Sequence, residues 1–93
     1  MTNEMKKLAT MLIEAEIPFQ VVIQKEWDNT PQICVPNEDN RMIDFVCNKI
    51  SMGYKDGTLE AYVTSQDDVY GYLTAEHAFI IVNMEIAANI LYC

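Results

Sequence analysis

Apolar residues near the start of the chain recur at steps of three and four residues, which is the spacing of one face of an α-helix. Met5, Leu8 and Leu12 belong to this stripe. The pattern predicts an amphipathic helix over residues 3–16, and the helix ends before Pro18 because proline cannot continue a helix.

From residue 19 onward apolar positions alternate with polar ones, as they do in a β-strand that has one wetter side. The alternation, together with the turn residues between the apolar runs, predicts four strands, over residues 19–24, 32–35, 41–50 and 58–63. Asp56-Gly57 is a strong hairpin signal because both residue types tolerate positive φ, so the sheet is expected to be mainly an antiparallel meander. Residues 64–71, which include Asp67 and Asp68, are predicted to form an acidic loop.

The last predicted element is a helix over residues 75–91, which begins after Thr74, a residue type that caps helices. Its sequence is apolar almost all the way round. A helix on the outside of so small a domain cannot bury that much apolar surface against one sheet. We therefore expect a homodimer or higher oligomer, with an interface that includes Phe79, Val82, Ile86 and Ile90.

The order of these elements predicts one α+β domain over residues 1–93. In this fold a small antiparallel sheet of about four strands is accompanied by an N-terminal helix and a long apolar C-terminal helix. The chain is 51% hydrophobic and 22% charged, a composition too apolar for intrinsic disorder. Its length leaves no room for a second domain.

The charge of the chain is strongly acidic, with six basic against fourteen acidic residues and a net charge of −8. This charge repels a phosphate backbone, so we expect no direct binding to nucleic acid. An acidic protein can instead approach a basic protein surface, or the charge can serve solubility alone. Charge by itself leaves both interpretations open.

Nothing in the sequence indicates export or a membrane. The opening segment carries Glu4, Glu14 and Glu16 where a signal peptide would be apolar or neutral. The longest apolar stretch, residues 78–93, falls short of the roughly 20 residues that span a bilayer. A cytoplasmic location is therefore expected.

The residues of catalytic or metal chemistry are few and scattered. Three cysteines, an odd number at wide spacing, form neither a disulfide framework nor a zinc site; they are Cys34, Cys47 and Cys93. His77 is the single histidine, and a surface position in the first turn of a helix is the alternative to a role as general base. We expect no enzymatic activity, no metal and no cofactor.

One segment does concentrate groups that hold polar ligands. Residues 48–55 bring two of the six basic residues together with an amide, a hydroxyl and a phenol. The segment is either a ligand site at one end of the sheet or an ordinary exposed hairpin. Trp27, in a predicted turn, either caps the sheet edge or anchors a ligand. The candidate ligand-binding residues are Arg41, Asn48, Lys49, Ser51, Tyr54, Tyr62 and Trp27.

The second half of the chain resembles a family of short phage and prophage proteins of Gram-positive bacteria. The resemblance rests on Gly71-Tyr72-Leu73-Thr74-Ala75-Glu76, on the preceding Asp67-Asp68-Val69, and on Cys47, Ser51 and Gly53 upstream. The chain departs from the family pattern at Asn48, Met52 and Thr58, where the family has histidine, tyrosine and leucine. If the family histidine is catalytic, its absence here argues against an enzyme.

The resemblance implies a phage accessory protein, and accessory proteins of this size often interfere with bacterial defence. Our leading hypothesis is a non-enzymatic sponge in the host cytoplasm, an oligomer that sequesters a small nucleotide-derived immune signal. Tyr54, Tyr62 or Trp27 would stack a base, and the basic and polar groups would hold phosphate and ribose. The alternative is an acidic inhibitor that occupies the nucleic-acid channel of a host defence nuclease, as an anti-CRISPR protein would.

Overall fold

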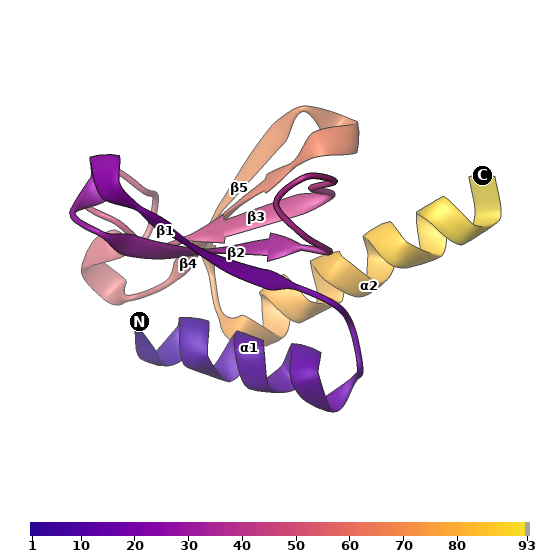
Figure 1. Ribbon diagram of the computed structural model, residues 1–93, viewed down its shortest axis with the longest axis horizontal. Coiled ribbons are helices and arrows are strands. Elements are labelled where there is room, and N and C mark those ends of the chain that lie inside the picture. Colours follow the sequence, from indigo (N-terminus) through magenta and orange to yellow (C-terminus); the bar gives the residue numbers. More distant parts are fainter. Residues whose placement is uncertain (93) are drawn as a thin grey trace.

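The computed structural model describes the backbone of residues 1–92 and the side chains of residues 1–90. Figure 1 shows a sheet with both helices packed on the same side of it. The elements are α1 (Asn3–Glu14), β1 (Gln20–Gln24), β2 (Thr30–Val35), β3 (Ile43–Val46), β4 (Leu59–Val63), β5 (Asp68–Leu73) and α2 (Ala75–Tyr92). Three short 3-10 helices lie between strands: η1 (Lys25–Trp27), η2 (Tyr54–Asp56) and η3 (Thr64–Gln66).

The strands form one antiparallel sheet in the order β1-β2-β3-β4-β5, so every strand pairs with its neighbour in sequence. The α+β class, the helix at each end and the antiparallel meander are confirmed, but the sheet has five strands and not four. The segment expected to be an acidic loop, residues 64–71, contains the first four residues of β5, a strand in which only Leu73 is buried. An edge strand that is exposed on both faces lacks the apolar alternation by which strands are recognised.

The core lies between the helices and one face of the sheet. Thr2 caps α1, since its hydroxyl accepts a hydrogen bond from the backbone N–H of Met5 at 3.3 Å. Phe45, at the centre of β3, is fully buried, and burial of such a side chain contributes about 1.5 to 3 kcal/mol. The other core side chains from the two layers include Met5, Leu8, Leu12, Ile33, Val35, Ile43, Leu59, Ala61, Val63, Ala78 and Val82.

Helix α2 buries one side and leaves the other exposed. Val82, predicted to lie in an interface, is fully buried in the protomer core, so its side chain is not available to a second copy. Phe79 and Ile86 are partly buried against the same core. Among residues 75–90 of the helix, the most exposed apolar side chains are Ile80, Met84 and Ile90, at 56%, 66% and 75%. Within residues 1–92 neither helix has the length and apolarity needed to cross a membrane.

The two ends of the sheet differ in charge. At one end lie η1 with the turn after it and the segment of residues 47–58, in which Lys25, Lys49 and Lys55 are balanced by Glu26, Asp28 and Asp56. At the other end the loop that joins β2 to β3 meets the end of β4, because the Thr64 N–H donates to the Met42 carbonyl at 3.0 Å. That end carries acidic side chains, namely Glu38, Asp39, Asp67 and Asp68.

Candidate functional site

The segment that follows β3 is held in shape by its own polar groups. The Ser51 hydroxyl accepts a hydrogen bond from the Asn48 N–H and donates one to the Asn48 carbonyl, both at 2.9 Å. The Asn48 side-chain oxygen accepts from the Ile50 N–H at 3.1 Å. Asn48 and Ser51 are both buried, so they shape the turn and leave Lys49 and Ile50 exposed at its tip.

A second tight turn directs the tyrosine and lysine of η2 outward. Gly53 has a φ of +93°, and a Cβ there would lie 2.0 Å from the Thr58 hydroxyl, so only glycine fits. The Thr58 N–H donates to the Gly53 carbonyl at 3.0 Å, and this bond closes the loop around η2. Tyr54 and Lys55 are consequently exposed on the outside of the loop.

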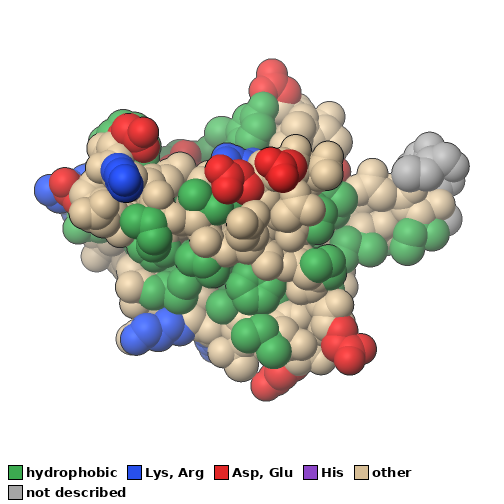
Figure 2. Space-filling model, viewed as in Figure 1, with side chains coloured by type: hydrophobic (Ala, Val, Ile, Leu, Met, Phe, Trp, Pro, Cys, Tyr) green, Lys and Arg blue, Asp and Glu red, His purple; other side chains and the backbone are tan. Residues whose placement is uncertain are grey.

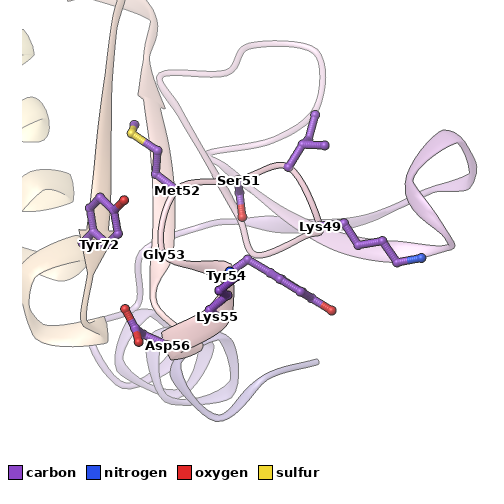
Figure 3. A pocket seen from close by; sticks show the side chains of 9 residues that line it. Lys49, Ser51, Met52, Gly53, Tyr54, Lys55, Asp56 and Tyr72 are labelled. Carbon is purple, nitrogen blue, oxygen red and sulfur yellow. The ribbon is translucent and has the colours of Figure 1, made fainter.

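The two turns enclose a surface hollow of about 560 Å³. Figure 3 shows Tyr72 of β5 on one side of it and Lys49 and Tyr54 on the other. This volume lies within the roughly 300 to 1,000 Å³ of small-molecule sites. The lining residues are Lys49, Ile50, Ser51, Met52, Gly53, Tyr54, Lys55, Asp56 and Tyr72.

A second hollow of about 230 Å³ adjoins the first and shares Lys49 and Ile50 with it. Its remaining lining residues come from η1 and the turn after it, and include Trp27, which is 41% exposed. The Lys49 ammonium lies 2.7 Å from a carboxylate oxygen of Asp28. The hydrogen bond and charge of Asp28 raise the pKa of Lys49, so this lysine stays protonated in the neutral range.

The structure brings together four of the seven residues predicted to bind a ligand. Lys49, Ser51 and Tyr54 line the larger hollow, and Trp27 lines the smaller one beside Lys49. Asn48 lies next to them but is buried, and its side-chain oxygen is taken by the turn. The Ser51 hydroxyl is likewise occupied within the turn, which leaves Lys49, Tyr54 and Trp27 as the available groups.

Arg41 and Tyr62 lie away from these hollows, toward the acidic end of the sheet. A guanidinium nitrogen of Arg41 lies 3.4 Å from a carboxylate oxygen of Asp44, and the Tyr62 hydroxyl donates to Asp67 at 2.6 Å. Arg41 precedes β3 whereas Lys49 follows it, and a strand rises about 3.3 Å per residue. Residues before and after one strand therefore lie at opposite ends of the sheet.

Six residues that line the larger hollow are absent from the predicted ligand-binding set, namely Ile50, Met52, Gly53, Lys55, Asp56 and Tyr72. Tyr72 was missed because it lies in β5, a strand that was not predicted. It has a φ of +59°, which is rare for a side chain of this size. Lys55 carried a usable signal, since it adjoins Asp56-Gly57 in the loop that also presents Tyr54.

The candidate catalytic groups lie elsewhere. Burial, followed by the nearby Asp44 carboxylate, raises the pKa of Cys34 to about 11, and burial also raises the pKa of Cys47. Both thiols are protonated at neutral pH and are poor nucleophiles. His77 is exposed in the first turn of α2. Cys93 lies outside the described residues, and among those described no group of three or more His, Cys, Asp or Glu side chains is arranged to hold a metal ion.

The two hollows suit a ligand that has both a flat ring and a negative charge. Tyr54, Tyr72 and Trp27 offer aromatic faces, on which a base stacks with about 1 to 3 kcal/mol. Lys49 and Lys55 offer ammonium groups for a phosphate or carboxylate. No protein-family model matches the chain, and neither a curated protein nor a solved structure matches it. The chemistry of these hollows is therefore what indicates a function.

Proposed function

We propose that the protein is a non-enzymatic binding protein that holds a small nucleotide-like ligand in the two adjoining hollows. The observation that carries the proposal is the position of Lys49, which lines both hollows between Trp27 on one side and Tyr54 on the other. An ammonium group between aromatic side chains matches a phosphate next to a base. Because residues 71–76 resemble phage proteins, we further propose that the ligand is an immune signal. The protein would then be a sponge that withholds this signal in the host cytoplasm.

Lys49 and Lys55 can bind an anionic ligand without the loss of a strong interaction in the free protein. The side chains of Lys49 and Asp28 are 73% and 65% exposed, and an ion pair this exposed contributes little because solvent screens it. A phosphate can take the place of Asp28 at the Lys49 ammonium, because a phosphate carries more negative charge than a carboxylate and offers more acceptor oxygens. Lys55 forms no ion pair with any residue in the described part of the chain, so its ammonium is free for a second anionic group.

The net charge of −8 does not oppose binding at this end of the molecule. Interactions between exposed charges are screened beyond about 8 Å at physiological salt. A ligand in the hollows therefore responds mainly to the local charges and little to the carboxylates at the far end of the sheet. The local charges are those of Lys49, Lys55, Glu26, Asp28 and Asp56.

The proposal is tested by incubating the purified protein with small molecules extracted from infected, defence-bearing cells. After filtration and denaturation, mass spectrometry identifies what the protein releases. We expect an intact nucleotide from the wild-type protein and much less from the Lys49→Ala/Tyr54→Ala variant. Release of a converted product would point to an enzyme, and an empty wild-type protein would contradict the proposal.

A second candidate function is favoured by the acidic end of the sheet. Glu38, Asp39, Asp67 and Asp68 are all exposed in the turns at that end. An exposed cluster of carboxylates is complementary to the basic channel of a host defence nuclease, which it would occupy in place of nucleic acid. Such a complex should weaken steeply with salt, and a complex that persists unchanged in high salt would count against this alternative.

A further inference from the structure

Strand β1 lies at the edge of the sheet, with β2 on one side only. In Figure 1 this strand crosses the front of the molecule, and no other element lies in front of it. An edge strand presents a row of backbone N–H and C=O groups that lack a partner within the sheet. Such a row is a template for pairing with another strand.

The composition of β1 does not protect this edge. Its five residues, Gln20–Gln24, carry no charge and include neither proline nor glycine. Val21 pairs with Ile33, so it lies on the helix-covered face, yet Val21 and Ile23 remain 41% and 54% exposed. Figure 2 shows hydrophobic side chains gathered on this front face. Natural proteins usually place charges, proline or a bulge on an edge that must stay free.

The opposite edge strand has the protection that β1 lacks. Strand β5 begins with the charged Asp68, and its pairing with β4 is irregular between Leu59 and Ala61. Its residue Tyr72 has a φ of +59°, which disrupts the extended backbone. The β5 edge thus has features that prevent pairing with another strand, and the β1 edge has none. This difference indicates that another strand pairs with β1.

The sequence of β1 also indicates its partner, because Gln-Val-Val-Ile-Gln is nearly the same in both directions. In antiparallel pairing about Val22, Gln20 meets the partner's Gln24, Val21 meets the partner's Ile23, and Val22 meets its own copy. Amides therefore oppose amides and apolar side chains oppose apolar side chains. A two-fold axis through such a strand makes a self-complementary interface.

We propose that a second copy of this chain pairs antiparallel with β1, joining the two sheets into one continuous sheet. The partner's Val21 and Ile23 would cover the same exposed residues of the first copy, and each apolar side chain so buried contributes to the association. The uncharged strand lets two chains of charge −8 meet without carboxylates at their contact. This inference goes beyond ligand binding, since β1 lines neither hollow.

The first test measures the mass of the protein in solution by sedimentation at micromolar concentration. We expect a dimer for the wild type and a monomer for Val21→Lys, since a lysine on an edge strand blocks pairing. Val69→Lys is the matched control, because Val69 is equally exposed, at 40%, on the other edge strand, and it should remain a dimer. A monomeric wild type would overturn the proposal. So would a dimer that survives Val21→Lys and is dissociated by Met84→Lys on α2.

The second test detects the predicted register and does not depend on a loss of stability. Residues directly opposite in an antiparallel pair have Cα atoms about 4.5 to 5.5 Å apart, and a disulfide spans about 4.4 to 6.8 Å. Val22→Cys, made in a Cys93→Ser background, should therefore form a covalent dimer under mild oxidation, whereas Val69→Cys should not. Equal cross-linking of both variants, or none of Val22→Cys, would refute this pairing. Circular dichroism checks that each variant is folded.

Discussion

Replacement of Lys49 by alanine should weaken binding of a nucleotide without weakening binding of its base and sugar. Lys49 lines both hollows and is the charged residue that they share. If this ammonium holds a phosphate, Lys49→Ala lowers the affinity for adenosine monophosphate and leaves the affinity for adenosine nearly unchanged. The side chain is 73% exposed, so its removal should not affect folding.

The size of the effect follows from two opposing contributions. A hydrogen bond from a charged donor contributes about 1.5 to 3 kcal/mol. In the free protein the same ammonium binds Asp28 at 2.7 Å, and release from that exposed, solvent-screened pair offsets part of this contribution. Lys49→Ala should therefore raise the dissociation constant roughly 2- to 150-fold. Asp28→Asn should act in the opposite direction and tighten binding by up to about fivefold.

The protein carries its own reporter, because its single tryptophan, Trp27, lines the smaller hollow. Titration followed by tryptophan fluorescence gives the dissociation constant of each variant. Arg41→Ala is the matched control, since it removes one positive charge at the opposite end of the sheet. Its affinity for adenosine monophosphate should equal that of the wild type.

Three results would refute this reasoning. A wild-type protein whose fluorescence does not respond to either ligand would exclude these hollows as a nucleotide site. An equal loss of affinity in Arg41→Ala and Lys49→Ala would mean that net charge, not a contact, governs binding. An equal loss for adenosine and its monophosphate in Lys49→Ala would place the lysine against the ring or sugar.

Three further predictions concern stability and reactivity. Gly53→Ala should lower the free energy of unfolding by about 2 kcal/mol, because φ is +93° and the added Cβ would meet Thr58. Gly57→Ala, with φ of +73° and nothing within 4 Å of the added Cβ, should lower the free energy of unfolding by only about 1 kcal/mol. Urea titration of both variants measures the two losses. Cys34, with its pKa raised to about 11, should resist iodoacetamide at pH ~8 until the protein is unfolded, as peptide mass spectrometry would show. Burial raises the pKa of Asp44, so the folded state binds this proton more tightly than the unfolded chain and loses stability as pH rises through that interval. Asp44→Asn should therefore stabilise the protein at neutral pH and have little effect below the ordinary carboxyl pKa of about 3.9, measured by unfolding at both pH values.

The sequence was sufficient to predict those elements whose apolar pattern is produced by burial on one side. Residues Met5, Leu8 and Leu12 mark α1 correctly because all three pack against the sheet. Strand β3 was predicted to run to Ile50 but ends at Val46. The Ser51 hydroxyl bonds to the Asn48 backbone and the Asn48 side chain accepts from the Ile50 N–H, and these bonds form a turn. An apolar alternation says nothing about such competing side-chain bonds.

Only those residues of the site that are close in sequence could be predicted to lie together. Lys49 and Tyr54 were found because they lie in one loop. The contact between Lys49 and Asp28 joins residues from separate turns, so it depends on how the β1–β2 hairpin lies against the loop after β3. Arg41 was wrongly assigned to the site for a related reason. It was expected in the same strand as the site residues, but the two ends of an extended strand lie far apart in space.

The separation of charge along the sheet gives the two candidate functions opposite requirements, so one pair of variants can distinguish them. Three of the six basic residues, Lys25, Lys49 and Lys55, lie at the end with the hollows, where Glu26, Asp28 and Asp56 balance them. The other end carries the excess of exposed carboxylates, with Asp67 and Asp68 among them. A protein that captures an anionic ligand needs the first end and is indifferent to the second. An inhibitor of a basic channel needs the second and is indifferent to the first. Protection of the phage by Lys49→Ala but not by Asp67→Asn/Asp68→Asn would therefore favour the inhibitor, and the reverse would favour the sponge.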